Sequence, residues 1–233
     1  MAIFKNNPPI VTNGLVLYVD AANKISYPGT GTTWSDLSGN GVNGTLQNGP
    51  TFNSANGGSI VFDGSNDYVN LPYNTNYNFT TITSLIWIKT PIQYTGGYRI
   101  VISKQSFNIH DRDFNFYIAS PSSNGVISQL HFSTARLTTY NGFLNTSLSL
   151  DSWYQVGFSL GNGFLNYILN GQIIHSSTTT GDFNASSNYN INIGRADSHF
   201  LGNVGNTLLY NRALSQQEIQ QNYNATKTRF GLT

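Results

Sequence analysis

The chain has 233 residues, its formal net charge at pH 7 is +1, and only 9% of its residues are charged, against about 25% in an average domain. Asn, with about thirty positions, takes much of the place of the charged residues together with Ser, Thr and Gly. This balance excludes the basic footprint of a nucleic-acid binder, while 39% hydrophobic residues argue against disorder and the absence of Cys excludes disulfides and thiolate metal sites.

The N-terminal segment "MAIFKNNPPIVTN" has one Lys and no apolar run behind it, so it does not predict a secretory signal peptide. No stretch of the chain approaches the ~20 apolar residues of a membrane span, and we expect no membrane insertion. We expect a complete soluble protein made in a cytoplasm, with residues 1–13 as an extended arm and residues 14–233 as a single domain. The arm could add to a neighbour's sheet edge or lie in its groove, and a disordered or locally packed terminus is equally consistent with it.

Short apolar segments between clusters of Gly, Asn, Asp and Ser predict β-strands along the whole chain. The predicted strands are 14–20, 59–64, 81–89, 98–104, 113–120, 126–133, 153–160, 164–170, 189–194 and 206–211. Residues 21–52 predict ordered loops with one or two short strands, pinned to the body by Trp34 and Leu37. Ten or more short strands without intervening helices indicate an all-β, two-sheet antiparallel sandwich or jelly roll.

Three of these segments have especially clear patterns. Residues 153–160 alternate apolar and polar side chains, which places one face on a core and the other toward water. Residues 84–89 are apolar on both faces, as in a central strand that is covered on each side. The pair Asn170 and Gly171 stands between two apolar runs, and Asn-Gly is the strongest short signal for a hairpin because both residues accept a positive φ.

The segment "LSQQEIQQNY" predicts the single short helix, near the C-terminus. Ser215 is followed three residues later by Glu218, the only Glu of the chain, and this spacing predicts a capping box at the start of the helix. Leu214, Ile219 and Tyr223 are spaced to dock the helix on the sandwich. The sequence therefore gives Glu218 a structural role.

Two Asp pairs are candidate calcium sites. His110, Asp111, Arg112 and Asp113 form the densest polar cluster, and Asp111 and Asp113 share a face in an extended strand, as ligands of a hard cation would. The alternative is a hairpin loop in which Arg112 and the two carboxylates pair in water.

The second candidate pair, Asp63 and Asp67, has the alternative of a tight turn in which Asp accepts local backbone hydrogen bonds. Asp20 and Asp36 are similar cases. No cofactor is required by the sequence, and calcium is the single candidate ion.

Exposed aromatic side chains beside Asn and Thr are suited to hold neutral carbohydrate, because a ring face and fixed amides together recognise a sugar. The aromatic candidates are Tyr73, Tyr77, Tyr94, Tyr98 and Tyr140, although many Tyr residues of a sandwich are simply half-buried at its rim. The candidate ligand-binding residues are Tyr94, Arg99, His110, Asp111, Arg112 and Asp113. The four His residues have no metal-ligand spacing, and no nucleophile elbow or phosphate-binding loop is present.

Several quoted segments resemble, in order, the successive motifs of laminin-G-like domains of the concanavalin A-like lectin/glucanase superfamily. They are "GSIVFDGSNDYVNLP", "TITSLIWIKT", "LDSWYQVGFSLGNGFLNYILNGQII", "INIGR" and "FLGNVGNTLLYNRALSQQEI". The resemblance as a whole covers roughly residues 14–225. The segment "GLVLYVDAANKISYPGTGTTWSDLSGNGVNGTLQNGP" is similar to the opening of such domains in structural proteins of tailed phages, cyanophages among them. The resemblance implies a concanavalin A-like jelly roll that binds more often than it catalyses. The glucanase branch has a Glu-x-Asp-x-x-Glu motif, which a chain with one Glu cannot contain.

The sequence leaves two functions open. The first is a virion surface protein of a phage, a capsid decoration, cement or fibre-associated subunit, with capsid or tail proteins as partners and self-association possible in principle. The second is a lectin-like module that binds cell-surface glycan, with or without calcium. Glycoside hydrolase or lyase activity is a remote third possibility. Hydrolysis of a glycosidic bond usually needs two facing carboxylates, and with Glu218 engaged in the capping box only the nine Asp residues are left to supply them. We therefore expect no enzymatic activity and no catalytic residues.

Overall fold

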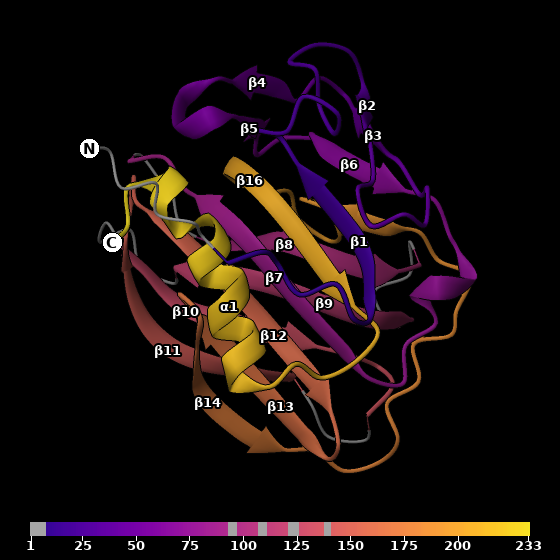
Figure 1. Ribbon diagram of the computed structural model, residues 1–233. Coiled ribbons are helices and arrows are strands. Elements are labelled where there is room, and N and C mark those ends of the chain that lie inside the picture. Colours follow the sequence, from indigo (N-terminus) through magenta and orange to yellow (C-terminus); the bar gives the residue numbers. More distant parts are fainter. Residues whose placement is uncertain (1–7, 93–96, 107–110, 121–125, 138–140) are drawn as a thin grey trace.

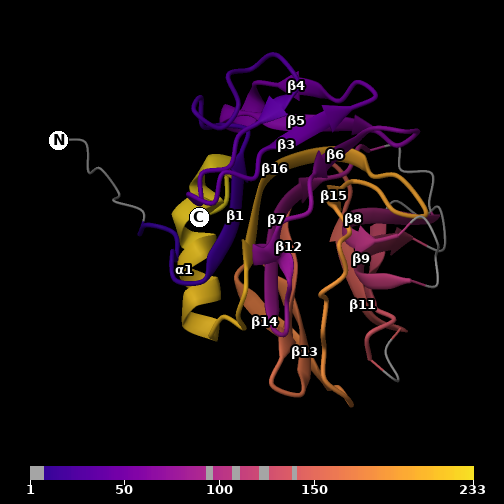
Figure 2. The same ribbon diagram turned by 90° about the vertical axis from the view of Figure 1, so that its right-hand side faces the viewer.

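The computed structural model describes residues 8–92, 97–106, 111–120, 126–137 and 141–233. Two antiparallel sheets, called A and B below, pack face to face, and one short helix lies on the outer face of sheet A (Figures 1 and 2). The fold is thus the predicted all-β sandwich with a C-terminal helix. Among the described residues, no helix has the length and apolar character needed to cross a membrane.

Each sheet has eight strands. Sheet A runs in the order β14 (Gln172–Thr178), β13 (Phe164–Leu169), β12 (Trp153–Gly161), β7 (Ile82–Lys89), β16 (Leu201–Tyr210), β5 (Ser59–Asp63) and β4 (Thr51–Asn53), and β1 (Leu15–Asp20) also pairs with β16. Sheet B runs in the order β11 (Asn141–Ser149), β10 (Val126–Ser133), β9 (Arg112–Ser120), β8 (Gly97–Gln105), β15 (Ile191–Ile193), β6 (Tyr68–Leu71), β3 (Gly44–Gln47) and β2 (Thr33–Trp34). The helix α1 is Gln216–Thr226, and three short 3-10 helices are η1 (Ala55–Gly57), η2 (Thr75–Tyr77) and η3 (Lys227–Phe230).

The main core lies between the sheets and is built by the period-two alternation of the strands. Val156, Phe158 and Leu160 of β12 point into it, as the pattern of residues 153–160 predicts. The expectation that the other face of this strand is turned toward water was wrong, because Gln155 and Ser159 are buried beneath the layer that joins sheet A to α1. Phe158 contacts Phe114 and Phe116 of the opposite sheet at ring-centroid distances of 5.6 and 5.4 Å. Burial of these large rings contributes to the hydrophobic stabilisation of the sandwich.

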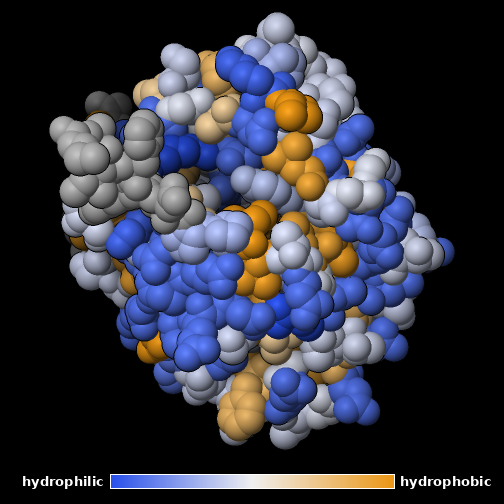
Figure 3. Space-filling model, viewed as in Figure 1, coloured by the Kyte–Doolittle hydropathy of each residue, from blue (hydrophilic) through white to orange (hydrophobic). Residues whose placement is uncertain are grey.

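A second apolar layer joins the outer face of sheet A to α1. Leu85 of β7 packs there with Leu214 and Ile219, so β7 is covered on both faces, as its sequence predicts. Trp87, two residues further along β7, stacks with Tyr223 and Phe230 at ring-centroid distances of 5.6 and 4.2 Å. The outward side of α1 is hydrophilic (Figure 3).

The described part of the N-terminal arm, residues 8–13, lies along its own domain. The backbone N–H of Val11 donates to Asn222 Oδ1 at 2.8 Å, and the Tyr210 hydroxyl donates to the Val11 carbonyl at 2.8 Å. Gln221 Nε2 reaches the carbonyl of Pro9 at 2.8 Å. This segment therefore matches the locally packed alternative, and residues 1–7 lie outside the described part of the chain.

The ten predicted strands agree with observed ones to within a few residues, except the last. The prediction missed β6 and β11, and it included β14 only as the second half of the Asn170–Gly171 hairpin. The strand predicted at 206–211 begins at Leu201, because Leu201 to Val204 pair with β5 before the chain bulges and continues against β1. Residues 21–52 contain the short strands β2 and β3, in agreement with the one or two strands expected there, and β4 begins at Thr51. Trp34 is fully buried there, whereas Leu37 is only partly buried.

The two local motifs are present in the structure. Asn170 and Gly171 join β13 to β14 with φ of 47° and 78°, as an Asn-Gly hairpin turn requires. Ser215 Oγ accepts the Glu218 N–H at 3.3 Å, and Glu218 Oε2 accepts the Ser215 N–H at 2.9 Å. The structure also adds a partner that the sequence reasoning missed: Arg212 donates two hydrogen bonds to Glu218, at 2.9 and 2.6 Å.

Candidate functional site

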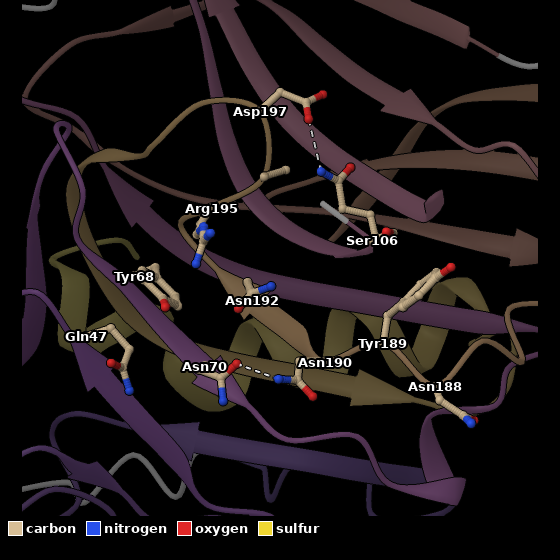
Figure 4. A pocket seen from close by; sticks show the side chains of 12 residues that line it. Gln47, Tyr68, Asn70, Ser106, Asn188, Tyr189, Asn190, Asn192, Arg195 and Asp197 are labelled. Atoms are coloured by element: carbon tan, nitrogen blue, oxygen red, sulfur yellow. Dashed lines mark hydrogen bonds between the residues drawn. The ribbon is translucent and has the colours of Figure 1, made fainter. Parts of the chain in front are cut away.

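The outer face of sheet B is the face of the sandwich that no helix of the described residues covers, whereas α1 lies on the opposite side of the molecule (Figure 2). An open pocket with a cavity volume of about 810 Å³ lies on this face. Its floor comes from β3, β6, β8 and β15, and its rim comes from the residues before and after β15 (Figure 4).

Strand alternation explains why the floor is polar. In β6, Val69 and Leu71 are fully buried in the core, so Tyr68 and Asn70 point outward into the pocket. In β15, Ile191 and Ile193 point inward, and Asn192 points outward.

Arg195 and Tyr68 form one side of the pocket. The guanidinium carbon of Arg195 lies 4.5 Å from the centroid of the Tyr68 ring, in the geometry of a cation–π contact. Tyr68 enters the pocket from β6, and Arg195 follows β15 (Figure 4). The planar guanidinium is thereby held in place rather than free to rotate, because one of its faces is covered by the ring.

Amide hydrogen bonds fix the other side chains of the pocket. Asn190 Nδ2 donates to Asn70 Oδ1 at 2.9 Å, and Asn190 Oδ1 accepts the backbone N–H of Tyr73 at 2.9 Å. Gln105 Nε2 donates to Asp197 Oδ1 at 3.0 Å (Figure 4). Asp197 is the only carboxylate among the residues that line the pocket in the described part of the chain. The site therefore offers oriented amides, one guanidinium and one carboxylate that is already hydrogen-bonded.

The polar character continues across the whole sheet in one register. Residues that lie opposite one another, from β2 to β11, are all uncharged and polar: Thr33, Thr45, Asn70, Asn192, Ser103, Asn115, Ser133 and Asn141. The members of this row on β8, β9 and β10, which are Ser103, Asn115 and Ser133, are buried. Asn115 Oδ1 has no hydrogen-bond partner among the described residues.

The predicted site around Asp111 and Asp113 is arranged differently from either expectation. Arg136, which the sequence reasoning did not select, donates to Asp113 Oδ1 at 2.7 Å and to Asp111 Oδ1 at 2.8 Å. Arg112, the expected partner, instead donates to Ser133 Oγ at 3.1 Å. The prediction of an Arg112 pair was wrong because Arg112 and the aspartates are neighbours in a strand, whereas Arg136 reaches both carboxylates from a separate loop.

A fully buried Lys104 also contacts Asp113, at 2.9 Å. Lys104 Nζ donates to the carbonyls of Tyr77 and Ala185 as well, at 2.9 and 2.6 Å. Burial lowers the pKa of Lys104, and the neighbouring Asp113 opposes this effect. Two cationic side chains therefore already occupy the Asp113 carboxylate, which is where calcium would have to bind.

The second calcium candidate forms local turns. Asp63 Oδ1 accepts the N–H of Ser65 at 2.8 Å and that of Asn66 at 3.3 Å, and these hydrogen bonds lower the pKa of Asp63. The buried Asp67 accepts the N–H of Asp63 at 3.0 Å. Among the residues that the structure describes, no group of three or more His, Asp or Glu side chains is placed to hold a metal ion.

The remaining predicted ligand-binding residues do not gather in the pocket. Arg99 of β8 donates to the carbonyls of Gly64 and His199, at 3.2 and 3.4 Å, and so ties two loops to sheet B. Tyr94 and His110 lie outside the described residues.

The aromatic candidates separate by exposure. Tyr77 is fully buried, so it cannot serve as an exposed platform. Tyr73 is partly buried and makes a hydrogen bond with Asn78, and Tyr98 is 60% exposed on sheet B. Tyr140 lies outside the described residues. Of the three predicted aromatic residues that the structure describes, Tyr98 is the one with a large exposed surface on sheet B.

The sequence reasoning missed Tyr68, Asn70, Asn192 and Arg195. Their signal was present in "DYVNL" and "INIGR", where polar residues alternate with aliphatic ones in short strands. That alternation says that the polar side chains face away from the core. It does not say that two segments more than 100 residues apart pair with each other, and that pairing is what creates the pocket.

Comparisons with known proteins identify the type of fold. A laminin-G-type family model, described as the concanavalin A-like lectin/glucanases superfamily, matches residues 63–220. A search of the curated proteins found no match.

Solved structures that resemble the chain do so at low sequence identity, which establishes the fold alone. The sialidase of Trypanosoma rangeli matches with a TM-score of 0.64 and 16% identity over 97% of this chain, and the chain spans only 36% of the sialidase. Domain 4 of AbnA, an extracellular arabinanase of Geobacillus stearothermophilus, matches with a TM-score of 0.63 and 19% identity over 90% of this chain and 98% of that domain. The binding domain of botulinum neurotoxin serotype G matches with a TM-score of 0.67 and 16% identity over 90% of this chain and 50% of that one.

Proposed function

The chain belongs to the concanavalin A-like lectin/glucanase superfamily, and we propose that it is a non-enzymatic module that binds a neutral glycan in the pocket on the outer face of sheet B. The observation that carries this proposal is the composition of the pocket, which is lined mainly by amides with one cation–π pair, Arg195 on Tyr68. Amides present both a donor and an acceptor, as do the hydroxyl groups of a sugar. A site of this kind recognises hydroxyl-rich, uncharged molecules.

Preorganisation favours binding at this site. Asn70 and Asn190 hold each other at 2.9 Å, and Arg195 rests on a ring, so the polar groups lose little freedom when a ligand binds. Asn192 lies between them on the short strand β15, with its side chain half-exposed and aimed into the pocket.

The proposal that the module is not an enzyme rests on the placement of its acids. The single carboxylate lining the pocket, Asp197, is hydrogen-bonded to Gln105, and the nearby Asp111 and Asp113 are paired with Arg136. Glu218 is paired with Arg212 in the first turn of α1, on the opposite side of the molecule. Hydrolysis of a glycosidic bond usually needs an acid and a facing carboxylate in one cleft, and the described residues of this pocket do not include such a pair.

The structural neighbours support carbohydrate as the ligand class. The arabinanase domain that matches over 98% of its length was solved in complex with arabinotriose, and the matching neurotoxin fragment is a binding domain. These are properties of those proteins. For this chain they make arabinan a sensible first probe in a panel of soluble polysaccharides.

The test is affinity gel electrophoresis against soluble arabinan, xylan, galactomannan, mixed-linkage β-glucan and, as an anionic member, alginate. We expect the wild-type protein to be retarded by at least one neutral polysaccharide, and Asn192→Ala to lose the retardation. The matched control is Asn224→Ala, which removes a half-exposed Asn from α1 on the other side of the molecule.

Two outcomes would overturn the proposal. One is wild-type mobility that no member of the panel changes. The other is release of reducing sugar from a retained polysaccharide, since a binding module leaves its ligand intact. Retardation by alginate alone would contradict the assignment of a neutral ligand.

A second candidate function is a role on the surface of a phage particle, with capsid or tail proteins as partners. The observation that favours it is the resemblance of residues 14–50 to the opening of similar domains in tailed-phage structural proteins. Such a role is compatible with glycan binding, because a decoration or fibre-associated protein can also grip a cell surface. Saturable binding of the purified protein to beads coated with purified phage capsids tests it. Binding no stronger than that to beads coated with serum albumin would count against it.

A further inference from the structure

Besides the pocket, the outer face of sheet B carries a row of stacked rings. Tyr117, His131 and Phe143 lie opposite one another on β9, β10 and β11. Their ring centroids are 4.6 and 5.2 Å apart, and the rings are inclined by 17° and 30°, so they form a continuous stack across three strands.

Tyr98 of β8 packs edge-on against Tyr117 and His131, at the β9 end of this stack. Its ring is nearly equidistant from Tyr117 and His131, at 5.6 and 5.4 Å, and nearly perpendicular to both. His131 is 7% exposed beneath its neighbours, and its Nε2 lies 2.8 Å from Gln129 Oε1. Burial lowers the pKa of His131 to about 4, so the ring is neutral at physiological pH and stacks without a charge. Contact with the stack thereby fixes the orientation of the two outer rings, Phe143 at one end and Tyr98 at the other.

Those outer members, Tyr98 and Phe143, are 60% and 54% exposed. Large apolar side chains that are held rigidly in solvent indicate a contact surface, since exposure of a ring carries an unfavourable hydration free energy. We call Tyr98, Tyr117, His131 and Phe143 the aromatic row.

The aromatic row and the pocket belong to one surface. Asn192 of the pocket lies opposite Ser103 on β8, which lies opposite Asn115 on β9. Two strand spacings of about 4.8 Å separate Asn192 from Asn115, and Tyr117 stands two residues, about 7 Å, further along β9. The resulting separation of about 12 Å between the pocket and the nearest ring of the row exceeds the width of one sugar ring.

We propose that the aromatic row is a second sugar-binding subsite and that the ligand is an extended polysaccharide chain that spans the pocket and the row, rather than a single terminal sugar. This inference rests on the proposed function. The hydroxyl groups of one sugar unit meet the amides and Arg195 in the pocket, and the C–H face of a later unit packs against Tyr98 and Phe143. The ligand is a neutral polymer, because the row contributes only aromatic surface and an uncharged imidazole.

The experiment compares the wild-type protein with Tyr98→Ala, Phe143→Ala and Asn192→Ala. The ligands are the neutral polysaccharide that retards the wild type most strongly and the monosaccharide from which that polysaccharide is built. The matched control is Phe164→Ala, which removes a ring that is 47% exposed on β13 of the other sheet. Exposed substitutions of this kind leave the core intact, and circular dichroism with thermal unfolding verifies the fold of each variant.

We expect Tyr98→Ala and Phe143→Ala each to weaken binding of the polymer by about five- to tenfold, as loss of one aromatic contact predicts, with little change for the monosaccharide. Phe164→Ala should bind both ligands like the wild type. Equal polymer binding by Tyr98→Ala, Phe143→Ala and the wild type, with binding lost in Asn192→Ala, would refute the second subsite while leaving the proposed function standing. Absence of any polysaccharide binding would overturn the proposed function itself, and a concentration-dependent dimer that Phe143→Ala abolishes would assign the row to a second copy of this chain instead.

Discussion

The Arg212–Glu218 pair makes the sharpest quantitative prediction. Glu218 accepts two hydrogen bonds from Arg212 and one from the backbone N–H of Ser215, and these partners, Arg212 first, lower its pKa from 4.5 to about 2. The difference of about 2.5 corresponds to at most about 3.4 kcal/mol at 1.36 kcal/mol per pKa unit. Because the Glu218 side chain is 30% exposed, solvent screening reduces the expected contribution to about 1–2 kcal/mol.

Two substitutions separate the charge from the cap. Glu218→Gln retains an oxygen that can accept the Ser215 N–H but loses the charge, and we expect it to lower the free energy of unfolding at pH 7 by about 1–2 kcal/mol. Glu218→Ala also removes the cap and should cost about 0.5–1 kcal/mol more. For a domain of this size, the larger loss corresponds to a fall in Tm of about 4–8 °C.

The pH dependence has a definite sign. The folded state holds the carboxylate with a lowered pKa, so its stabilising effect is complete above pH 4.5 and is lost as the pH falls through about 2. Urea unfolding of the wild type and of Glu218→Gln between pH 7 and pH 3 should give a difference in stability that narrows below pH 4.5. Asp182→Asn, which removes the same charge from an exposed loop, is the control and should stay close to the wild type.

Equal stability of the wild type and Glu218→Gln at pH 7 would refute this reasoning. A difference that does not change with pH would do the same, because it would mean that the charge of Glu218 is not what stabilises the helix start.

Two further predictions concern the buried contacts. Gly171→Ala should destabilise the fold by about 1–3 kcal/mol, because its φ is +78° and an added Cβ would lie 2.6 Å from Tyr223 Cβ. Gly163→Ala is the control for backbone strain alone, since its φ is +79° and no atom lies within 4 Å of its added Cβ. Equal losses of stability for the two variants in urea unfolding would show that Tyr223 does not clash. Lys104→Met should cost about 3–5 kcal/mol, because it leaves the buried Asp113 without one of its cations, whereas Lys89→Met, which breaks the exposed pair with Asp151, should cost no more than about 1 kcal/mol. A Lys104→Met protein as stable as Lys89→Met in thermal unfolding would contradict the assigned role of the buried pair.

Local rules were sufficient where the interacting residues are close in sequence. The capping box needs residues three apart, and the Asn170–Gly171 turn needs two neighbours that accept positive φ, so both could be predicted from the chain. The burial of both faces of β7 could also be predicted from the sequence, because a strand with apolar side chains on both faces must be covered on both.

Contacts between distant segments could not be predicted in the same way. Arg136 lies more than twenty residues from Asp111, and nothing in its own surroundings distinguishes it from Arg112. Lys104 reaches Asp113 across a hairpin and the Ala185 carbonyl across 81 residues. The calcium hypothesis failed to anticipate these cations because composition reveals how many charges exist, not which of them the fold brings together.

A sandwich of short strands with few charges and a capped C-terminal helix follows from the chain alone, since periodicity and turn chemistry act over neighbouring residues. The pocket and the aromatic row depend on the folded arrangement. That arrangement places β6 beside β15, which brings Asn70 and Asn192 into one pocket, and it aligns Tyr117, His131 and Phe143 across three strands. The physical reason is that strand order and register are set by the packing of the whole core, and each outward-facing polar or aromatic residue acquires its neighbours only from that packing.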